Sequence, residues 1–367
     1  MLPFLSFDAQ DEYRDELLQA IQRVVDSKWF VLGSELANFE QEYAHLHGVR
    51  ECVGVASGLD ALIIALKSLE VGVGDEVIVP SNTYIATWLA VSAVGAIPVP
   101  VEPNPRTYNL DPSRLESAIT SATKAVIPVH LYGQACDMSR ISLTARKHGL
   151  SIIEDNAQAH LATWKGRLTG SFGSINATSF YPSKNLGAFG DSGALTTDDV
   201  GLAHRARLIR NYGSGAKYFN EIKGMNSRLD EVQAAVLRVK LGRLVKATRR
   251  RQDLARLYTD FLQVSPSVTV PSVQDGATHV FHLYVIQCDD RDGLKRFLSL
   301  NGVESMIHYP VAPHEQAAYS DLRFQSGDFP IAEAIARRAL SLPLYPGMKD
   351  SDIEKVADLV SSYFGGN

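Results

Sequence analysis

Uninterrupted apolar runs alternate with segments of helical periodicity over the first two-thirds of the chain. Apolar residues recur at helical spacing over 60–69, 85–94 and 138–148. The runs between and around them are apolar throughout, which is typical of strands buried on both faces of a largely parallel sheet. We therefore predict an α/β fold with a mixed, mostly parallel sheet sandwiched by helices. The apolar runs are CVGVAS (52–57), EVIVPS (76–81), IPVPVE (97–102), KAVIPVHLYG (124–133) and LSIIEDNA (150–157).

The pattern changes after residue 228. Apolar residues keep helical spacing over 229–262, which predicts one long helix that links two domains. A Pro/Ser-rich joint at 265–272 follows. We expect a large domain over 1–250 and a smaller α+β C-terminal domain over 251–367. In the smaller domain the pattern predicts strands at 279–288 and 303–309, and helices at 294–300, 332–340 and 350–363.

Composition and charge narrow the class of protein. The 367 residues are 45% hydrophobic and 21% charged, as in a soluble globular enzyme, which excludes disorder, collagen and coiled coil. Lys and Arg number 36 against 41 Asp and Glu, so we expect no general attraction to nucleic acid or to an anionic membrane. Local groups must then hold any anionic ligand. The basic run Lys246, Arg249, Arg250 and Arg251 lies in a helical stretch, where we expect a solvated face.

Cysteine usage and the N-terminal residues predict a cytoplasmic protein. Cys52, Cys136 and Cys288 are far apart and lack the paired spacing of a zinc site or a disulfide framework. The sequence begins without a basic leader and turns acidic within a dozen residues, unlike a signal or transit peptide. The stretch 77–101 is uncharged, but prolines interrupt it, so it is interpreted as strand, helix and strand rather than a membrane span.

Polar and glycine-rich tails follow four of the predicted strands. Ligands of parallel α/β sheets bind at the carboxyl ends of strands, so these tails predict one composite site. The tails are Ser57-Gly58, Ser81 to Tyr84, His130 to Gly133 and Glu154 to Gln158.

Lys184 stands among small and aromatic residues in SFYPSKNLGAFGDSGALTT, with no carboxylate closer than Asp191. Burial lowers the pKa of a lysine, which suits it to Schiff-base chemistry. A structural lysine that caps a turn is the alternative.

Two carboxylates, Glu154 and Asp155, end an apolar strand directly. A buried carboxylate is costly unless a cation or strong donor meets it, and the ring nitrogen of pyridoxal phosphate is such a donor. A salt bridge is an alternative, and a metal ligand is a weaker one because no second carboxylate or His pair follows at ligand spacing. Farther upstream, the strand that ends at Ser57-Gly58 runs straight into a helix, whose free amides form a phosphate site. This signal is weak alone, since all parallel α/β proteins have such turns.

In this order and context, these segments resemble the sugar-nucleotide aminotransferases of the DegT/DnrJ/EryC1/StrS family, which use pyridoxal phosphate within the fold type I aspartate aminotransferase superfamily. The resemblance covers almost the whole chain. It extends over VLGSELANFEQEYA, SGLDAL, PSNTYIAT, GAIPVPVE, AVIPVHLYGQACDM, IIEDNAQAH, IRNYGS, MNSRLDEVQAAVLRVKL, IHYPVAPHEQAAY and LSLPLYP.

The resemblance implies roles for the strand-end residues. The family's Schiff-base lysine falls on Lys184, and the partner of the pyridinium nitrogen falls on Asp155. Gln158 matches the residue beside the phenolic oxygen of the cofactor. Tyr84 matches the aromatic residue that stacks on the ring, and Trp88 competes for that role one helical turn later. Tyr84 could also belong to the core.

The resemblance also implies a phosphate cradle made by the backbone of Gly58 and Leu59 and the hydroxyl of Ser179. Many relatives carry Thr where this chain has Leu59, so only the backbone N–H serves there. Asn226 matches a residue that the neighbouring subunit donates, which implies a homodimer with a shared active site. Ser179 could instead satisfy a backbone group, and Asn226 could be the N-cap of the following helix.

The implied activity is transamination, because relatives that act as dehydratases carry His at the position of Lys184. L-glutamate is the implied donor. SGLDAL and PSNTYIATWLAV look most like the branch that aminates C3 of a dTDP-3-keto-6-deoxyhexose, giving a dTDP-3-amino-3,6-dideoxyhexose. Alternatives are a C4 aminotransferase on a 4-keto-6-deoxy sugar nucleotide and a regulatory protein that binds the cofactor without turnover. Segments that match substrate-facing loops contain His308, Tyr309, Arg228, Lys217, Tyr218 and His314.

The oxidoreductase class is disfavoured, because no G-x-G-x-x-G motif follows the first predicted strand. The sequence also contains no recognisable DNA-binding appendage, which argues against a transcription factor.

Overall fold

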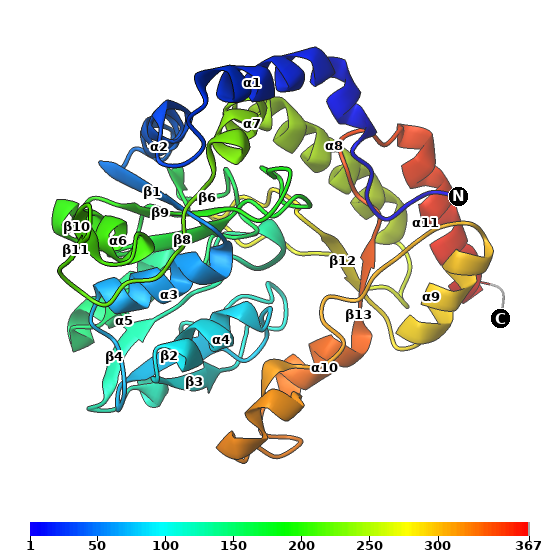
Figure 1. Cartoon of the computed structure of the whole chain (residues 1–367). Coiled ribbons are helices and arrows are strands. Elements are labelled where there is room, and N and C mark those ends of the chain that lie inside the picture. Colours follow the sequence, from blue (N-terminus) through cyan, green and yellow to red (C-terminus); the bar gives the residue numbers. More distant parts are fainter. Residues whose placement is uncertain (366–367) are drawn as a thin grey trace.

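A mixed sheet forms the centre of the larger lobe in a computed structural model that describes residues 1–365 (Figure 1). Four parallel strands lie in the order β3 (Ile97–Val101), β2 (Glu76–Pro80), β4 (Thr123–Val126) and β5 (Ser151–Ile152). Three more lie in the order β8 (Asn176–Ser179), β9 (Gly193–Thr197) and β1 (Glu51–Val55), with β9 antiparallel to both neighbours. The predicted mixed, mostly parallel sheet is confirmed.

Asp155 joins the two groups of strands. Its backbone forms one parallel bridge with Val129, beyond the end of β4, and another with Ala177 in β8. The residue that ends the apolar run LSIIED therefore lies in the middle of the sheet, with paired strands on both sides.

Both faces of the sheet are covered, as the continuous apolar runs predict. In β2, Val77 and Val79 pack into one core with α3 (Gly58–Ser68), α4 (Ala86–Ala93) and α6 (Val200–Arg210). Ile78 points to the other face, where it packs with α5 (Met138–His148). This alternation is the period of a strand, and here both sides of it are apolar. Two more helices, α1 (Arg14–Ser27) and α2 (Ser34–His47), contact α7 (Glu231–Leu241) in the larger lobe.

The predicted single helix over 229–262 is wrong, because two helices occupy this segment. α7 ends at Leu241 and α8 runs over Leu244–Leu262. Gly242 lies at the break, and glycine is a poor helix former. The break allows α7 to pack on α1 and α2 while α8 packs on α11 (Asp350–Gly365) of the smaller lobe.

The smaller lobe is built on an antiparallel pair, β12 (Tyr284–Gln287) and β13 (Ala339–Leu342). α8, α9 (Arg291–Leu300) and α11 share its apolar core. Leu2 and Leu5 also pack against this core, so the first residues of the chain belong to this side of the molecule, near the label N in Figure 1. The boundary at residue 250 falls within α8, and the division into two domains stays a prediction.

Two elements of the smaller lobe differ from the sequence prediction. The predicted strand at 303–309 makes only single bridges, from Val303 to Leu2 and from Met306 to Ser341, so it never pairs with one partner for long enough to form a strand. The helix predicted over 332–340 is α10 (Pro330–Arg338), after which the chain turns extended and enters β13.

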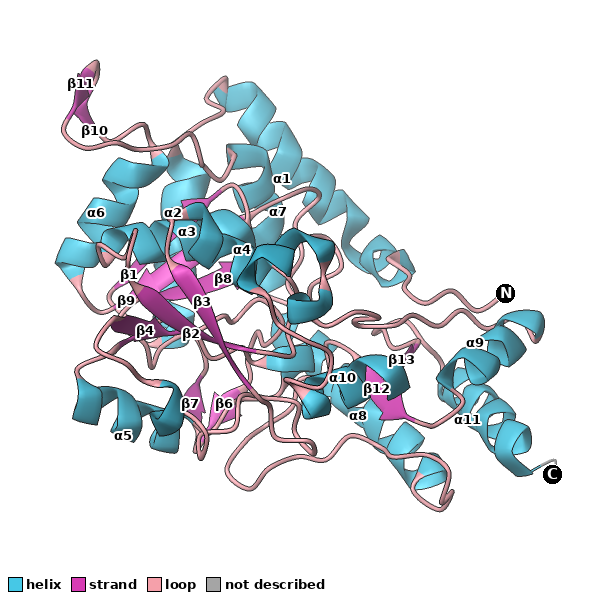
Figure 2. Cartoon of the chain, turned by 90° about the horizontal axis from the view of Figure 1, so that it is seen from below, coloured by secondary structure: helices cyan, strands magenta, loops and turns pink. Residues whose placement is uncertain are grey.

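Short elements complete the described chain. They are the 3₁₀ helices η1 (Asp8–Tyr13), η2 (Glu116–Ala118), η3 (Leu131–Gly133), η4 (Pro313–Glu315) and η5 (Ala317–Leu322), and the hairpins β6 (Thr163–Trp164) with β7 (Arg167–Leu168) and β10 (Ser214–Ala216) with β11 (Phe219–Asn220). Figure 2 shows the β10–β11 hairpin standing out from the body of the molecule.

Over residues 1–365, the helices are all too short or too polar to cross a membrane. The three cysteines are free and buried. The basic run at 246–251 is only partly the solvated face that we expected. The side chain of Lys246 is exposed, whereas Arg251 is buried and its guanidinium donates to the carbonyl of Leu344 at 2.8 Å.

Candidate active site

Lys184 lies in a tight turn between β8 and β9. Its amide donates to the carbonyl of Tyr181 at 2.8 Å, and the amide of Ala188 donates to the carbonyl of Phe180 at 2.8 Å. The turn leaves the lysine half-buried. Burial lowers the pKa of Lys184 to about 8, although the nearby Asp155 carboxylate opposes that shift. At pH 7 about a tenth of this side chain is then the neutral amine that a nucleophile or general base must be, far more than at the ordinary lysine pKa of 10.5.

The turn is held from two sides. Asn185 Nδ2 donates to the carbonyl of Val280 at 3.1 Å, and Lys240 Nζ from α7 donates to the carbonyl of Gly187 at 2.8 Å. A Cβ on Gly187 would lie 2.3 Å from the carbonyl oxygen of Pro182, so only glycine allows the chain to fold back here. These contacts fix the position of the lysine backbone.

Asp155 is buried beside this turn. Its Oδ2 accepts a hydrogen bond from Thr87 Oγ1 at 2.9 Å, and its Oδ1 accepts one from the amide of Ala157 at 3.2 Å. Burial raises the pKa of Asp155, while the Ala157 amide, the Thr87 hydroxyl and the Lys184 ammonium oppose the shift. A carboxylate accepts about four hydrogen bonds, so these two leave acceptor capacity for a donor from a ligand.

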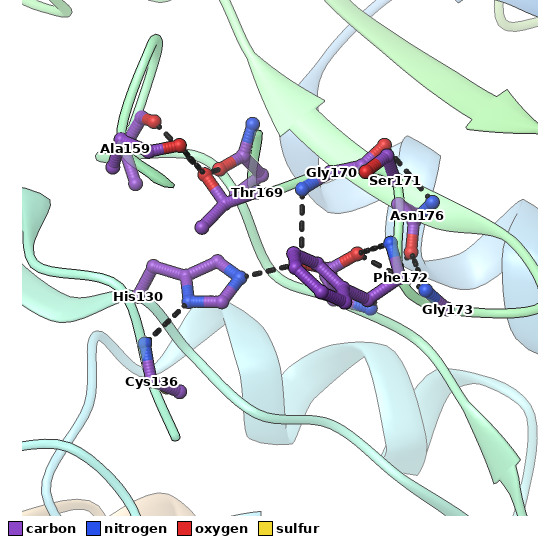
Figure 3. A network of polar contacts seen from close by, with 12 residues as sticks. His130, Cys136, Ala159, Thr169, Gly170, Ser171, Phe172, Gly173 and Asn176 are labelled. Carbon is purple, nitrogen blue, oxygen red and sulfur yellow. Dashed lines mark hydrogen bonds and ion pairs between the residues drawn. The ribbon is translucent and has the colours of Figure 1, made fainter. Parts of the chain in front are cut away.

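Glu154, the adjacent carboxylate, is fully buried and differs from Asp155 in its partners. Its oxygens accept hydrogen bonds from His130 Nε2 at 2.8 Å and from the amides of Gly170 at 2.9 Å, Phe172 at 2.5 Å and Gly173 at 3.0 Å. Figure 3 shows this network around His130 and the loop at 170–173. The protein itself satisfies Glu154, so its role is to hold this loop against the sheet.

The residues predicted to form a phosphate cradle lie together at the start of α3. Gly58 and Leu59 are the first two helical residues, so their amides have no intrahelical acceptor. Ser57 Oγ caps the helix by accepting from the amide of Asp60 at 3.1 Å. A Cβ on Gly58 would lie 2.6 Å from Ser179 Cβ, which shows how closely the helix start approaches the end of β8. The three predicted groups therefore meet in one place.

Aromatic and amide side chains lie around Lys184 and Asp155. The ring of Tyr84 is 53% exposed, and its centroid lies 5.1 Å from that of Tyr309. Gln158 Nε2 donates to the Tyr309 hydroxyl at 3.1 Å, and Gln158 Oε1 accepts from the amide of Tyr132 at 2.6 Å. Trp88, by contrast, is fully buried. Of the two aromatic candidates, only Tyr84 presents a free face to a ligand.

His308 and Tyr309 lie at the edge of the same group. His308 Nδ1 and Ser341 Oγ are 2.8 Å apart, and the Tyr132 hydroxyl donates to the carbonyl of His308. Burial, and then the charge of Lys184, lower the pKa of His308 to about 4. The imidazole is thus neutral near pH 7 and offers a hydrogen bond rather than a charge.

The structure does not bring Asn226, Arg228, Lys217 and Tyr218 to Lys184 of the same chain. Arg228 Nη1 donates to Asn211 Oδ1 at 3.0 Å. The other three are exposed, and Lys217 and Tyr218 form the tip of the β10–β11 hairpin. The alternative in which Asn226 caps a helix is wrong, because the N-cap of α7 is Asp230.

His314 is also absent from the group around Lys184. Its side chain is 1% exposed and lies 3.4 Å from Glu333 Oε1, with its ring against Phe329. Buried in this way, it has no face for a substrate, which corrects the expectation from its sequence segment.

Two functional candidates were missed by the sequence prediction. Thr87, which donates to Asp155, is one turn after Thr83 in PSNTYIAT, and the two hydroxyls are 3.1 Å apart. This i, i+4 pair of threonines at a strand end was the available signal. His160 is fully buried beside Phe180, and burial lowers its pKa to about 3, so it stays neutral next to Lys184. Only its position in IIEDNAQAH could have suggested it.

The donor set fits pyridoxal phosphate. Free helix-start amides with a hydroxyl suit its phosphate, a carboxylate with spare acceptor capacity suits its ring nitrogen, and an exposed aromatic ring suits its face. The amine of Lys184 suits its aldehyde.

Comparison with known proteins gives a consistent result. The model of the DegT/DnrJ/EryC1/StrS aminotransferase family matches residues 11–361. The dTDP-3-amino-3,6-dideoxy-alpha-D-galactopyranose transaminase of Aneurinibacillus thermoaerophilus is 48% identical over 99% of each chain. The crystal structure of S. venezuelae DesV in complex with ketimine intermediate is 48% identical, with a TM-score of 0.97 over 99% of this chain and 98% of that one. The structure of ntda from Bacillus subtilis with bound cofactor pmp is 31% identical, with a TM-score of 0.88 over 98% of this chain and 83% of that one.

Proposed function

The chain belongs to the DegT/DnrJ/EryC1/StrS aminotransferase family, and we propose that it moves an amino group from L-glutamate to C3 of a dTDP-3-keto-6-deoxyhexose. The product is a dTDP-3-amino-3,6-dideoxyhexose. The observation that carries this proposal is the half-buried Lys184 amine, with its pKa near 8, beside the Asp155 carboxylate. The choice of sugar and nucleotide is supported by the relative that is 48% identical over 99% of the chain.

The residues that would hold pyridoxal phosphate follow from the geometry. The amides of Gly58 and Leu59 and the Ser179 hydroxyl would hold its phosphate, and Tyr84 would cover one face of its ring. When bound, the cofactor supplies an electrophilic carbon and a ring that withdraws electrons from the bond to be broken. Asp155, whose oxygens accept hydrogen bonds from Thr87 and Ala157, would accept one from the ring nitrogen.

Lys184 acts as nucleophile and proton carrier. As a neutral amine it would take the proton from the donor's α carbon, and as an ammonium it would hold that proton for its return. In the second half of the cycle it carries protons in the opposite direction. Gln158, which is hydrogen-bonded to Tyr309, orients that hydroxyl at the edge of the site, where we place the sugar together with His308.

Several exposed residues support the proposal of a shared active site. Asn226 and the hairpin residues Lys217 and Tyr218 do not reach Lys184 within one chain, and the hairpin stands out from the body (Figure 2). We propose that the chain forms a homodimer in which these residues and Arg228 reach the partner's site. The cationic side chains would then meet the diphosphate of the substrate.

The experiment is turnover of the purified holoenzyme with L-glutamate and a panel of keto-sugar nucleotides, with the product identified by mass and by NMR. An amino group at C3 of a dTDP-sugar is the expected result. Amination at C4, or turnover only with another nucleotide, would correct the substrate. Failure on every sugar nucleotide would contradict the proposal and favour a regulatory protein. Lys184→Ala should remove the visible absorption band of the bound cofactor in either case.

A further inference from the structure

A cationic cavity of about 210 Å³ lies beside the Lys184 turn, between α7, α8 and the N-terminal residues. The phosphate cradle at Gly58 and Ser179 is not part of its wall, so it is separate from the place proposed for the cofactor's phosphate. Among its lining residues, Glu12 is the one carboxylate. The cationic residues that line it are Lys184, Lys240, Arg243, Lys246, Arg250 and Arg251.

Three of these cations are paired with carboxylates at the rim. Arg243 pairs with Glu16, Arg250 with Asp350 at 2.8 Å, and Lys246 lies 3.8 Å from Glu12. The local acidic groups therefore compensate the exposed rim. The uncompensated positive charge therefore lies on the buried wall.

Lys240 and Arg251 form that wall. Lys240 is 8% exposed, and among residues 1–365 its ammonium has one hydrogen-bond acceptor, the carbonyl of Gly187, and lies 4.6 Å from the ring centre of Phe189. An ammonium has three donors, so two remain. Burial lowers the pKa of Lys240 to about 8. Burying a cation without an anionic partner costs free energy, and the Lys240 side chain is such a cation.

Arg251, in α8, is a second buried cation on the wall of this cavity. It is 5% exposed, and within the described chain its hydrogen bonds all come from Nη1, to the carbonyls of Phe281, His282 and Leu344. Carbonyl oxygens accept hydrogen bonds but carry no full charge. Burial lowers the pKa of Arg251 to about 10. Two buried cations on one cavity thus lack an anionic partner among residues 1–365.

We propose that this cavity binds a phosphoryl oxyanion held by Lys240 and Arg251. Its volume is below the roughly 300–1,000 Å³ of sites that enclose a drug-sized ligand, so it fits one phosphate group rather than a whole nucleotide. It shares Leu5, Ser183 and Arg251 with a second cavity that His308 lines. The phosphate group therefore comes from inorganic phosphate or from the end of a nucleoside diphosphate that enters through the second cavity.

An anion bound in this cavity affects Lys184 through one hydrogen bond, from Lys240 to the turn that holds Lys184. An anion beside Lys240 favours its ammonium form, which is the form that donates most strongly to the carbonyl of Gly187 in the lysine turn. The bound anion thus stabilises the turn that positions the catalytic amine.

The test is the melting temperature of the holoenzyme, whose own phosphate cradle is filled by the cofactor, in phosphate-free buffer with chloride, inorganic phosphate or dTDP added. Ligand at ten times its Kd should raise the Tm by roughly 2 °C in the wild type. Lys240→Gln keeps a donor for the Gly187 carbonyl but has no charge, and its Tm should not respond. Lys246→Gln, at the exposed rim of the same cavity, should respond like the wild type.

Each result decides the proposal. A rise with phosphate that needs Lys240 assigns the site to the free ion, and a rise with dTDP alone that needs Lys240 assigns it to the nucleotide's phosphate. An equal rise in the wild type and Lys240→Gln, or no rise with either ligand, would overturn it. None of these outcomes depends on which keto-sugar the enzyme aminates.

Discussion

Asp155 and Glu154 are neighbours in the sequence, and both are buried, yet the structure gives them different tasks. Glu154 receives hydrogen bonds from His130 and three amides. Asp155 receives one from Thr87 and one from Ala157, which leaves it open to a ligand. The difference lies in the number of internal donors that reach each carboxylate, and donors supplied by distant segments decide it.

Thr87 should set the charge of Asp155. In Thr87→Val the carboxylate loses a donor that favours its charged form, so the already raised pKa of Asp155 rises further. Asp155 then becomes protonated at a higher pH as the pH falls, and the acidic limb of the kcat profile moves to higher pH. A hydrogen bond to a charged group contributes roughly 1.5–3 kcal/mol, which corresponds to a shift of about 1–2 pH units.

The control is Thr87→Ser, which keeps the hydroxyl and should keep the profile of the wild type. An unchanged acidic limb in Thr87→Val, measured together with the pH dependence of the cofactor's absorption band, would show that the threonine only fills space.

Capture of pyridoxal phosphate by the apo chain should report the pKa of Lys184. The ordinary lysine value is 10.5 and the folded value is about 8, so the neutral amine dominates above pH 8 instead of above pH 10.5. The capture rate should rise about tenfold per pH unit below that point and then level off. Stopped-flow absorbance measures it, with N-acetyl-lysine as the reference amine. A rate that keeps rising to pH 10 would contradict a lowered pKa.

At the residue scale, the sequence predicted those site residues whose roles follow from their flanking residues. Lys184 and Asp155 stand out because their flanking residues are apolar. Thr87 was missed because its partner is 68 positions away, and His314 was misplaced because its burial against Phe329 depends on a later segment.

At the scale of elements, the start of α3 matters most. Gly58 is needed because a Cβ there would lie 2.6 Å from Ser179 Cβ and 3.1 Å from Ser179 Cα, in the space where the amides face a ligand. A side chain would push the helix start away from β8. The closeness of these two segments is what distinguishes the proposed phosphate site from an ordinary strand-to-helix turn.

Gly58→Ala should therefore weaken cofactor binding. We expect the Kd for pyridoxal phosphate, measured by fluorescence titration of the apo chain, to rise by about tenfold or more, which corresponds to roughly 1.4 kcal/mol of lost contacts. Gly242→Ala is the matched control. Its φ is −62°, and the nearest atom to an added Cβ is 3.7 Å away, so the Kd should not change. Equal affinities in both variants would refute the close approach as the reason for glycine.

Helices with a strong local signal were predicted well, and α5 has the predicted bounds of 138–148. The break between α7 and α8 was missed because apolar periodicity continues across Gly242, and one glycine does not by itself end a helix; the two helices pack on different lobes. The segment 303–309 has the residues of a strand, but strands require a neighbour, and a single sequence does not show which neighbour is present.

At the scale of the whole molecule, the residues that do not reach Lys184 make the strongest case for a dimer. Asn226 is exposed, and Tyr218 on the hairpin is 85% exposed. Trp29, Phe30 and Phe189 are also exposed apolar side chains. The proposed second copy of the chain would cover these side chains.

Mixing two inactive variants should restore activity if the site is shared. Lys184→Ala and Asn226→Ala subunits, unfolded and refolded together in equal amounts, give heterodimers in which one of the two sites has both residues intact. Activity should return to about a quarter of the wild-type value, since half of the dimers are mixed and each has one good site. Each variant refolded alone is the control. If the mixture is no more active than the separate variants, Asn226 does not act across subunits.

The order of strands and the burial of Arg251 were beyond the sequence prediction. Apolar runs show that strands are buried but not which runs are adjacent, and the bridges of Asp155 to Val129 and Ala177 depend on that order. Arg251 lies in a basic run that has the composition of a solvated face. Its burial follows from carbonyl groups some 30 and 93 positions away.

The position of Asp155 between two groups of strands has a consequence for biosynthesis. As the chain leaves the ribosome, Val129 is available to Asp155 early, but Ala177 emerges later, with Lys184 close behind it. Until β8 docks, the carboxylate has an open side and no amine beside it. Asp155 and Lys184, the two groups of the proposed chemistry, are therefore brought together only when β8 docks on the sheet.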